Sequence, residues 1–391
     1  MTEWKTYKLS EIGTVVGGAT PSTSVSSYYG GDIPWLTPKD LSNFQDRYIE
    51  KGERNITQEG LDSCSAQLLP ANTVLFSSRA PIGYVAIAKN PIATNQGFKS
   101  IIPNEKVDSL FLYYILKYNK DKIEAMGSGT TFKEVSGAVM KNVEISLPGL
   151  EEQRRIAGIL GAIDDKIENN RRINTNLELQ AQALYKQWFV DNRNDDWEEK
   201  QLGEIALHIT DGVHNTVIDS PNGEYYLLSC KNIKSGQLFI GSNERRIDQE
   251  TFARLRKRTR LSQGDILVTS VGTVGEMYLV NEIPANYEFQ RSVAIIKPNQ
   301  SIISSYFLYS ALLYLQNEIK HLAHGAVQQC IFISDLKEYS LIVPNRSDIS
   351  AFDAVVAPMF NKIGVLQKEN ETLATLRDTL LPKLMNGEIK L

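Results

Sequence analysis

The feature that most constrains this chain is an internal duplication with a period near 195 residues. Residues 4–12 match 197–205, 75–83 match 267–275, 96–102 match 290–296, 109–113 match 305–309, and 141–148 match 337–344. The offset varies only between 192 and 196, so short insertions separate the two copies. A solenoid unit spans about 20–50 residues, so a repeat of this length indicates a duplicated domain. Two similar domains form a pseudo-two-fold symmetric object, which suits a ligand with two similar halves.

The duplication predicts a four-part organisation. At 391 residues the chain exceeds what one hydrophobic core usually organises. We expect globular copies at residues 1–147 and 193–345 and helical segments at 148–192 and 346–391. Each copy is predicted to be α+β, because short β-like runs alternate with Gly, Pro and Asn turns. The predicted strands are 73–77, 84–88, 266–269, 277–280 and 293–296, and the predicted helices are 109–118 and 304–319.

The two helical segments carry the same heptad seam. From Ile156 to Trp188, apolar or amide residues recur in alternating steps of four and three, and the seam returns 196 residues later. Each seam would be roughly 50 Å long at 1.5 Å per residue, so we predict two long antiparallel coiled-coil-like helices. The alternative is that each helix packs only on its own domain. Asn174 and Asn370 occupy equivalent positions, where a buried amide fixes register, and Pro358 is expected to kink the second helix or delay its start. The seam residues are Ile156, Leu160, Ile163, Ile167, Asn174, Leu177, Leu184, Trp188, Ile363, Leu366, Asn370, Leu373, Leu380 and Leu384.

Membrane and export signals are not found in the sequence. No stretch approaches 18 uninterrupted apolar residues, and the first residues have no apolar signal core. The three cysteines are scattered and lack metal-ligand spacing, which is typical of thiols in a reducing cytoplasm. We therefore expect a cytoplasmic protein.

The search for catalytic motifs is largely negative. The chain has no phosphate-binding G-x-x-x-x-G-K-[ST] loop, no glycine-rich methyl-donor loop and no Asn/Asp-Pro-Pro-aromatic motif. His321 and His324 lack the glutamate of a zinc-protease helix, so a metal site is not expected. Asp164 and Asp165 are interpreted as structural carboxylates at the head of the first helix.

Charge limits how the chain could bind nucleic acid. The net charge is −4, with 15 basic and 15 acidic residues in 1–147 and 14 against 16 in 197–345. A self-sufficient DNA binder is often basic, so any electrostatic footprint must be local or supplied by a partner. Residues 245–260 contain seven basic and two acidic residues. This run could meet phosphate, but such runs are usually solvated faces.

Two pairs of polar loops are the other candidates. Residues 77–83 and 269–275 follow strands, and their hydroxyls and backbone N–H groups could position a phosphate; alternatively they are tight turns that need glycine. Residues 127–133 and 324–329 lie at equivalent positions with different side chains, which fits two reading heads for two sequences. The candidate DNA-binding residues are Ser77, Ser78, Arg79, Gln96, Thr130, Thr131, Lys133, Arg254, Arg256, Lys257, Arg258, Arg260, Thr269, Ser270, Thr273, Gln290, Arg291, Gln328 and Gln329.

These motifs resemble a known family over essentially the whole chain. Residues 147–157, Leu-Pro-Gly-Leu-Glu-Glu-Gln-Arg-Arg-Ile-Ala, followed by Ile-Asp-Asp-Lys-Ile at 163–167, are similar to the entry of the first helix in the specificity (S, HsdS) subunits of type I restriction–modification systems. Residues 380–389 resemble that family's closing segment, and 264–269 with 272–275 resemble a frequent target-recognition-domain motif. One departure is that the second helix entry, 343–350, lacks the Glu-Gln pair, so the two helices are expected to treat their partners unequally.

The resemblance implies a non-catalytic reader of double-stranded DNA. It implies two target recognition domains that recognise a bipartite site with an unspecified gap. It also implies two modification (methyltransferase) subunits that carry S-adenosylmethionine and methylate adenine, and restriction/translocase subunits that use ATP and Mg²⁺. No cofactor is expected in this chain. The alternatives are a self-contained enzyme of unusual sequence and a structural adaptor that does not touch DNA.

Overall fold

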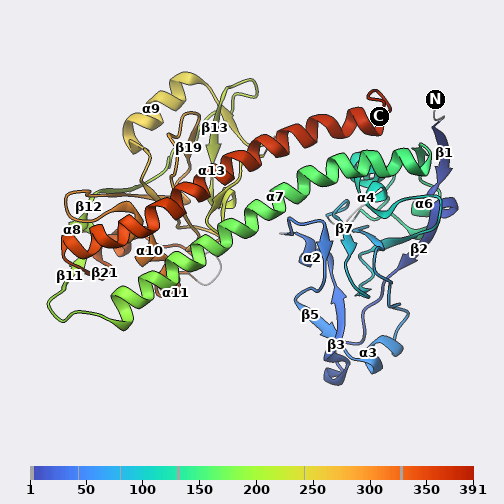
Figure 1. Ribbon diagram of the computed structural model, residues 1–391, viewed down its shortest axis with the longest axis horizontal. Helices are drawn as coiled ribbons and strands as arrows, with labels where there is room; N and C mark the ends of the chain where they lie inside the picture. Colours follow the sequence, from blue (N-terminus) through green and yellow to red (C-terminus); the bar gives the residue numbers. More distant parts are fainter. Residues whose placement is uncertain (1–3, 43, 80, 130–132, 242, 326–328) are drawn as a thin grey trace. The chain divides into compact units, whose positions relative to one another are not determined.

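The computed structural model describes residues 4–42, 44–79, 81–129, 133–241, 243–325 and 329–391, and it divides into two compact units (Figure 1). Unit 1 comprises Met1–Asn169 and Asn370–Leu391, and unit 2 comprises Asn170–Glu369. The two long helices, α7 (Leu150–Tyr185) and α13 (Arg346–Met385), each contribute one part to either unit. Each unit therefore combines one sequence copy with the beginning of one long helix and the end of the other.

Unit 1 is built around a five-stranded sheet. Its strand order is β2-β9-β6-β7-β4, beside a three-stranded sheet β5-β3-β8 and the antiparallel pair β1-β10. The strands are β1 (Lys5–Lys8), β2 (Gly13–Gly17), β3 (Tyr29–Leu36), β4 (Tyr48–Ile49), β5 (Arg54–Ile56), β6 (Val74–Phe76), β7 (Val85–Ala88), β8 (Ala93–Thr94), β9 (Lys99–Pro103) and β10 (Glu144–Leu147). The short helices are α1 (Leu9–Ile12), α2 (Pro38–Leu41), α3 (Gln58–Asp62), α4 (Ser109–Tyr118), α5 (Lys120–Ala125) and α6 (Gly137–Lys141).

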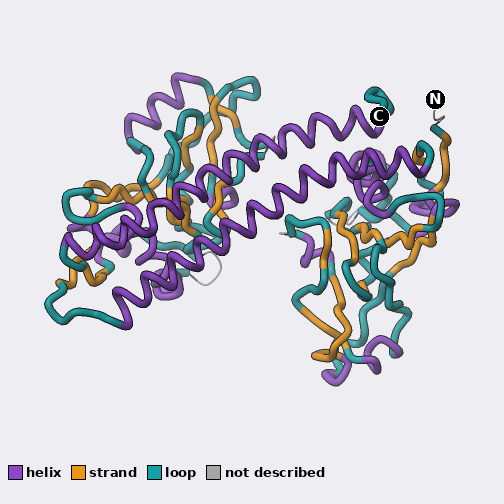
Figure 2. The backbone as a smooth tube through the Cα atoms, viewed as in Figure 1, coloured by secondary structure: helices purple, strands orange, loops and turns teal. Residues whose placement is uncertain are grey.

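Unit 2 repeats this plan with one strand fewer in its main sheet, β12-β20-β17-β18, beside β16-β13-β19 and the pairs β11-β21 and β14-β15. Strands and loops make up most of both globular parts (Figure 2). The strands are β11 (Glu198–Gln201), β12 (Ala206–Asp211), β13 (Tyr225–Leu228), β14 (Ile233–Lys234), β15 (Gln237–Leu238), β16 (Arg246–Ile247), β17 (Ile266–Thr269), β18 (Met277–Leu279), β19 (Tyr287–Phe289), β20 (Val293–Pro298) and β21 (Ser340–Val343). The short helices are α8 (Leu202–Ile205), α9 (Gln249–Thr259), α10 (Ser305–Tyr314), α11 (Gln316–His321) and α12 (Ile333–Glu338). The predicted α+β class with two long helices is confirmed.

One predicted helix is wrong in extent. Residues 304–319 are predicted to form a single helix, but α10 ends at Tyr314 and α11 begins at Gln316. The backbone of Leu315 between them (φ −88°, ψ 9°) leaves the helical range. Ser304 caps the start of α10 by accepting a hydrogen bond from Phe307 N at 3.0 Å. The first copy behaves in the same way, because α4 ends at Tyr118 and α5 begins at Lys120, with Asn119 between them.

The long helices run antiparallel within each unit. In unit 1, Ile156 and Leu160 of α7 share a core with Leu384 of α13. In unit 2, Tyr185 of α7 packs on Phe352 of α13 with ring centroids 6.3 Å apart. All fourteen predicted seam residues are buried or half-buried. The helices pack on each other as well as on the globular part of each unit, so the alternative of two independent helices is wrong.

Pro358 does not delay the start of α13, which begins at Arg346 and continues through the proline. By length and composition alone α13 could cross a membrane, but a core helix of a soluble protein passes the same test. Phe352, Val356 and Phe360 of this helix lie in the core of unit 2.

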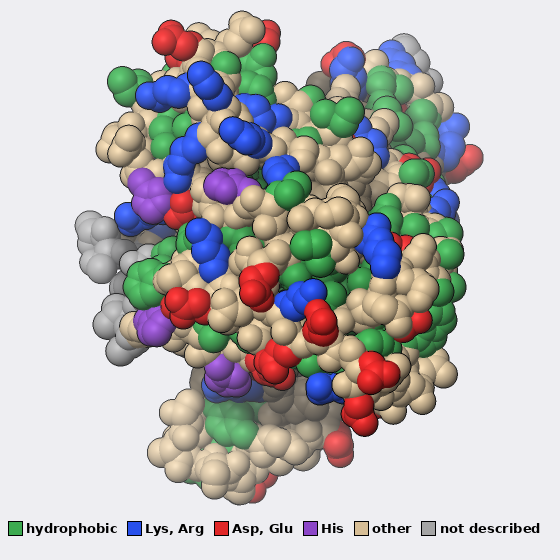
Figure 3. Space-filling model, turned by 90° about the vertical axis from the view of Figure 1, so that its left-hand side faces the viewer, with side chains coloured by type: hydrophobic (Ala, Val, Ile, Leu, Met, Phe, Trp, Pro, Cys, Tyr) green, Lys and Arg blue, Asp and Glu red, His purple; other side chains and the backbone are tan. Residues whose placement is uncertain are grey.

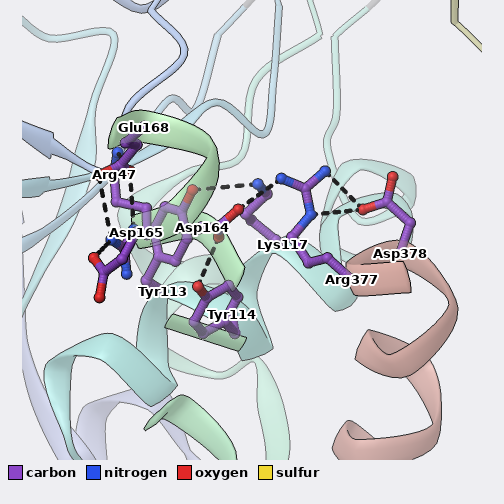
Figure 4. Close-up of polar contacts among 9 residues, drawn as sticks. All are labelled: Arg47, Tyr113, Tyr114, Lys117, Asp164, Asp165, Glu168, Arg377 and Asp378. Carbon is purple, nitrogen blue, oxygen red and sulfur yellow. Dashed lines mark hydrogen bonds and ion pairs between the residues drawn. The ribbon is translucent and has the colours of Figure 1, made fainter. Parts of the chain in front are cut away.

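The Asp164–Asp165 pair does not stand at the head of a helix, because α7 begins at Leu150. The expected dipole role is therefore wrong. In unit 1, Asp164 accepts hydrogen bonds from Tyr114 Oη at 2.6 Å and from Arg377 Nη1 of α13 at 2.8 Å (Figure 4). This carboxylate links α4 to both long helices. Burial, followed by the neighbouring Asp164 charge, raises the pKa of Tyr114.

A second ion pair joins α7 to the first sheet. Arg47, buried just before β4, donates from Nε to Glu168 at 2.9 Å and pairs with Asp165 (Figure 4). No local sequence pattern indicates this role for Arg47. At the equivalent positions of unit 2, offset by 196 residues, Asp164 and Arg377 become Phe360 and Ala181, both buried. The same helix packing is thus polar in unit 1 and apolar in unit 2.

The Glu-Gln pair at the start of α7 also has a structural role. Gln153 is buried, and its side chain accepts from Asp108 N at 3.0 Å and donates to the carbonyls of Lys106 and Pro148. Its equivalent in α13 is Ile349, which is fully buried in the core of unit 2. The interpretation of this departure as a difference in partner contacts is therefore wrong for Gln153. At this position unit 1 has a hydrogen-bonded glutamine, and unit 2 has an isoleucine in its apolar core.

Candidate nucleic-acid interface

Three loops from separate parts of unit 1 meet at one edge of its main sheet. Ser78 N donates to Gly97 O at 2.7 Å, and Val135 N donates to Ser78 O at 2.9 Å. Ser128 N donates to Glu134 O at 3.0 Å, and Glu134 N donates to Ser128 O at 2.9 Å. We call residues 77–83, 95–97 and 128–135, as far as they are described, the loop cluster of unit 1.

The same three loops meet in unit 2 through equivalent backbone bonds. Ser270 N donates to Ser292 O at 2.9 Å, and Ile331 N donates to Ser270 O at 2.8 Å. His324 N donates to Cys330 O at 2.8 Å, and Cys330 N donates to His324 O at 2.9 Å. The loop cluster of unit 2 comprises the described residues of 269–275, 290–292 and 324–331. The two clusters therefore share a backbone scaffold.

The predicted hydroxyl contacts to phosphate are contradicted by burial. Ser77, Ser78, Thr269 and Ser270 are buried and their hydroxyls are occupied within the turns. Ser77 Oγ donates to Pro81 O and accepts from Tyr84 N, both at 2.8 Å, and Thr269 Oγ1 accepts from Glu276 N at 2.8 Å. Gly83 and Gly275 adopt φ values of +95° and +82°, which favour glycine. The tight-turn alternative describes these loops.

The exposed candidates of unit 1 lie on top of this scaffold. Arg79 pairs with Glu134 at 2.9 Å, and Lys99 approaches the same carboxylate at 3.4 Å. Gln96 and Lys133 are exposed, and Thr20 donates to Gln96 Oε1 at 2.5 Å. Thr130 and Thr131 lie outside the described residues. The loops thus bring Arg79, Gln96 and Lys133 to one edge although they are up to 54 residues apart in the sequence.

The loop cluster of unit 2 borders an open cavity of about 310 Å³, lined by Asp211, His214, Arg291 and Phe332 among others. Asp211 lies 2.5 Å from His214 Nε2 and accepts from Arg258 Nη2 at 3.0 Å. The ring of His324 stacks on the half-exposed ring of Phe332 with centroids 5.2 Å apart. Thr273, Arg291 and Gln329 are exposed and Gln290 is half-buried, whereas Gln328 lies outside the described residues. The cavity residues His214 and Phe332 were missed by sequence reasoning, because nothing in their local pattern distinguishes them.

The basic run of 245–260 is divided by the structure. Arg254 and Lys257 are exposed on α9, and Arg260 caps its end with a left-handed backbone (φ +51°). Arg258 also donates to Gly212 O at 2.8 Å, which places the end of α9 beside the cavity. In the view of Figure 3, Lys and Arg side chains gather on the upper part of the molecule, at the height that α9 has in Figure 1. The exposed basic residues of α9 therefore lie near the loop cluster of unit 2.

Arg256, in contrast, is an internal anchor, so its expected contact with DNA is wrong. Its guanidinium donates to the carbonyls of Pro284 and Tyr287 at 2.7 and 2.9 Å and pairs with Glu288, whose side chain has 0% exposure. Thr259 Oγ1 donates to the same carboxylate at 3.0 Å. Burial raises the pKa of Glu288, while the Arg256 ion pair and the Thr259 bond oppose that shift.

Within the described residues, no group of three or more His, Cys, Asp or Glu side chains is placed to hold a metal ion. The three cysteines, all in the described part of the chain, are free thiols.

Comparison with known proteins identifies the family. The family model described as "Type I restriction modification DNA specificity domain" matches residues 1–179 and 194–356. The chain is 37% identical to the type I restriction enzyme MjaIX specificity subunit of Methanocaldococcus jannaschii, over 99% of this chain and 94% of that protein. It is 31% identical to the EcoR124I/EcoR124II specificity subunit of Escherichia coli, over 41% of each chain.

A solved structure shows the same fold. The S subunit of a type I restriction–modification system from M. genitalium superposes with a TM-score of 0.55 at 20% identity, covering 98% of this chain and 96% of the other. A duplicated domain, two long antiparallel helices and two equivalent loop clusters thus coincide with family matches to both copies. This chain belongs to the family of type I restriction–modification specificity subunits.

Proposed function

We propose that this chain is the non-catalytic DNA-reading subunit of a type I complex, and that each unit reads one half of a bipartite, gapped site. The observation that carries this proposal is the pair of loop clusters, which share their backbone bonds but differ in their side chains. Arg79 and Glu134 in unit 1 correspond to Val271 and Cys330 in unit 2. Two domains that recognise different sequences need different side chains on a common backbone, because base edges are distinguished by side-chain donors and acceptors.

The remaining functions are assigned to partner subunits. Two modification subunits would bind this chain, carry S-adenosylmethionine and methylate adenine in the recognised site. Restriction subunits would supply ATP- and Mg²⁺-dependent translocation and cleavage. The near-neutral charge of both copies supports this division, since partners would then provide further positive surface around the duplex. A complex of this kind would act in the cytoplasm.

The central test is to map methylated adenines in cells that express the chain with its modification subunit. We expect N6-methyladenine at one gapped, asymmetric motif. Exchanging residues 197–345 for the equivalent segment of a related chain should change one half of that motif and leave the other intact. An ungapped motif, or changes in both halves, would contradict the proposal. An unchanged DNA footprint on adding this chain to its partners would favour a structural adaptor, and methylation by the purified chain alone would favour a self-contained enzyme.

The α9 surface should contribute sequence-independent affinity. Changing Arg254, Lys257 and Arg260 together to alanine is expected to weaken binding to all duplexes. The slope of log affinity against log salt should fall by about 2–3, because each lost phosphate contact removes roughly 0.9 from it. Equilibrium binding at several salt concentrations measures this slope.

The matched control for the α9 surface keeps the charge, with Arg254→Lys and Arg260→Lys, and should leave the slope unchanged. Arg256 and Arg258 are left in place because they are bonded within unit 2. An alanine variant with the wild-type slope would show that α9 faces solvent in the complex.

A further inference from the structure

The backbone bonds correct the alignment of the two copies at the turn of each loop cluster. The sequence repeat sets Gln96 against Gln290. In the structure, Ala19 N donates to Thr94 O at 3.0 Å, and Val213 N donates to Phe289 O at 2.9 Å. These bonds anchor the first residue of each turn.

The last residue of each turn is anchored in the same way. Ser78 N donates to Gly97 O in unit 1, and Ser270 N donates to Ser292 O in unit 2. Two residues lie between the anchors in both copies. The equivalent of Gln96 is therefore Arg291, and the equivalent of Gln290 is Asn95.

The first of the two residues is less exposed than the second in both units. Asn95 Oδ1 accepts from Gly97 N at 2.9 Å, and Gln290 is half-buried. The second residue is exposed in both units. Each unit therefore presents one long polar side chain from the same point of an identical turn, and the two side chains differ.

Arg291 is available for a ligand. Its guanidinium makes no hydrogen bond or ion pair with the residues that the structure describes, although its backbone N donates to Val213 O at 3.0 Å. The carboxylate that shares its cavity, Asp211, is already engaged by Arg258 and His214. The guanidinium of Arg291 is thus not engaged by the described residues of unit 2, and α9 presents the exposed basic side chains of Arg254 and Lys257 near the same cavity.

Gln96 is oriented but not saturated. Thr20 donates to its Oε1 at 2.5 Å, which restrains the position of the amide oxygen. The second lone pair of Oε1 can still accept a hydrogen bond. The Nε2 group has no partner among the described residues and can still donate. This is the donor–acceptor pair that recognises the N7 and N6 atoms of adenine, just as an arginine fork recognises O6 and N7 of guanine.

We infer that this turn position reads one base in each half-site, an adenine through Gln96 and a guanine through Arg291. The inference rests on the proposed function and adds the residue and the base on each side. It also explains why Arg291 is isolated from nearby carboxylates, since an internal ion pair would compete with the base.

The test uses the full chain in complex with its modification subunits and duplexes that carry each of the four bases at every position of the mapped site. In the half assigned to unit 2, Arg291→Gln should reduce the preference for guanine at one position by about 5- to 150-fold, the range for losing one bidentate contact. Adenine should become preferred there. In the other half, Gln96→Arg should replace an adenine preference by one for guanine.

Two further variants separate base reading from other roles. Arg291→Lys keeps the charge but not the fork, so it should lose most of the guanine preference while keeping the salt dependence. If Arg291 instead contacts phosphate, Arg291→Gln will weaken all duplexes equally and lower the salt slope, which would overturn the inference. Arg193→Gln, an exposed arginine of unit 2 outside the loop cluster and α9, serves as the matched control, and thermal unfolding checks that each variant is folded.

The failure of this inference can be distinguished from failure of the proposed function. A wild-type complex that recognises no gapped site would contradict both. A gapped site whose base preferences are all unchanged in folded Arg291→Gln and Gln96→Arg variants would contradict only the base-reading assignment.

Discussion

Replacing Arg256 with methionine is expected to destabilise unit 2 by about 3–5 kcal/mol, because it leaves the fully buried carboxylate of Glu288 without its ionic partner. Urea unfolding followed by fluorescence measures the loss. The neighbouring variant Lys257→Met, on the exposed face of the same helix, should stay within about 0.5 kcal/mol of the wild type. Equal stability of the two variants would show that Arg256 is not an anchor.

The same variant should acquire a characteristic pH dependence. Without Arg256, burial is expected to raise the pKa of Glu288 further above its value in the unfolded chain, about 4.3. The folded state then keeps a proton that the unfolded state releases, so stability falls as the pH rises above that value. The loss in Arg256→Met should therefore be larger at pH 8 than at pH 5. Adding Glu288→Met should remove this pH dependence and recover much of the stability.

Replacing Asp164 with leucine is expected to destabilise unit 1 by about 3 kcal/mol, because Arg377 and the Tyr114 hydroxyl lose a shared buried acceptor. The value lies at the low end of the range for buried ion pairs, since Arg377 also pairs with Asp378 at 2.8 Å. Chemical unfolding of the full chain, monitored by a probe in unit 1, would measure the change.

The adjacent residue provides a matched control for Asp164. The side chain of Asp165 is 72% exposed, against 6% for Asp164, and its partner Arg47 retains Glu168. Asp165→Leu should therefore cost less than about 1 kcal/mol. The double variant Asp164→Leu/Arg377→Met should be more stable than Asp164→Leu alone, because an apolar contact already occupies this place in unit 2. A large loss from Asp165→Leu, or none from Asp164→Leu, would contradict the assignment of the buried link.

Local patterns in the sequence were sufficient for the repeating elements. The strand β17 and the helix α4 lie where alternation and spacing predicted them, and the seam from Ile156 to Leu384 marks residues that are buried or half-buried. These features depend on neighbours a few residues apart, which periodicity reports directly.

The choice between adjacent polar residues was not accessible in the same way. Arg256 and Lys257 are neighbours, as are Asp164 and Asp165, yet one of each pair is bonded inside the protein and the other faces solvent. Composition and spacing are nearly the same for both members. Arg256 and Asp164 are bonded inside the protein because they contact Glu288 and Arg377, which are 32 and 213 residues away in the sequence.

The sequence by itself determined that this protein has two copies of an α+β domain, two long helices with a shared seam, and exposed polar loops at equivalent places. Only the tertiary structure decided that Ser77 and Thr269 support the turns, and that Gln96 and Arg291 occupy the same position above them. The physical reason is that backbone bonds such as Ser270 N to Ser292 O join segments 22 residues apart. Such bonds set the register of a turn independently of the side chains that a sequence comparison aligns.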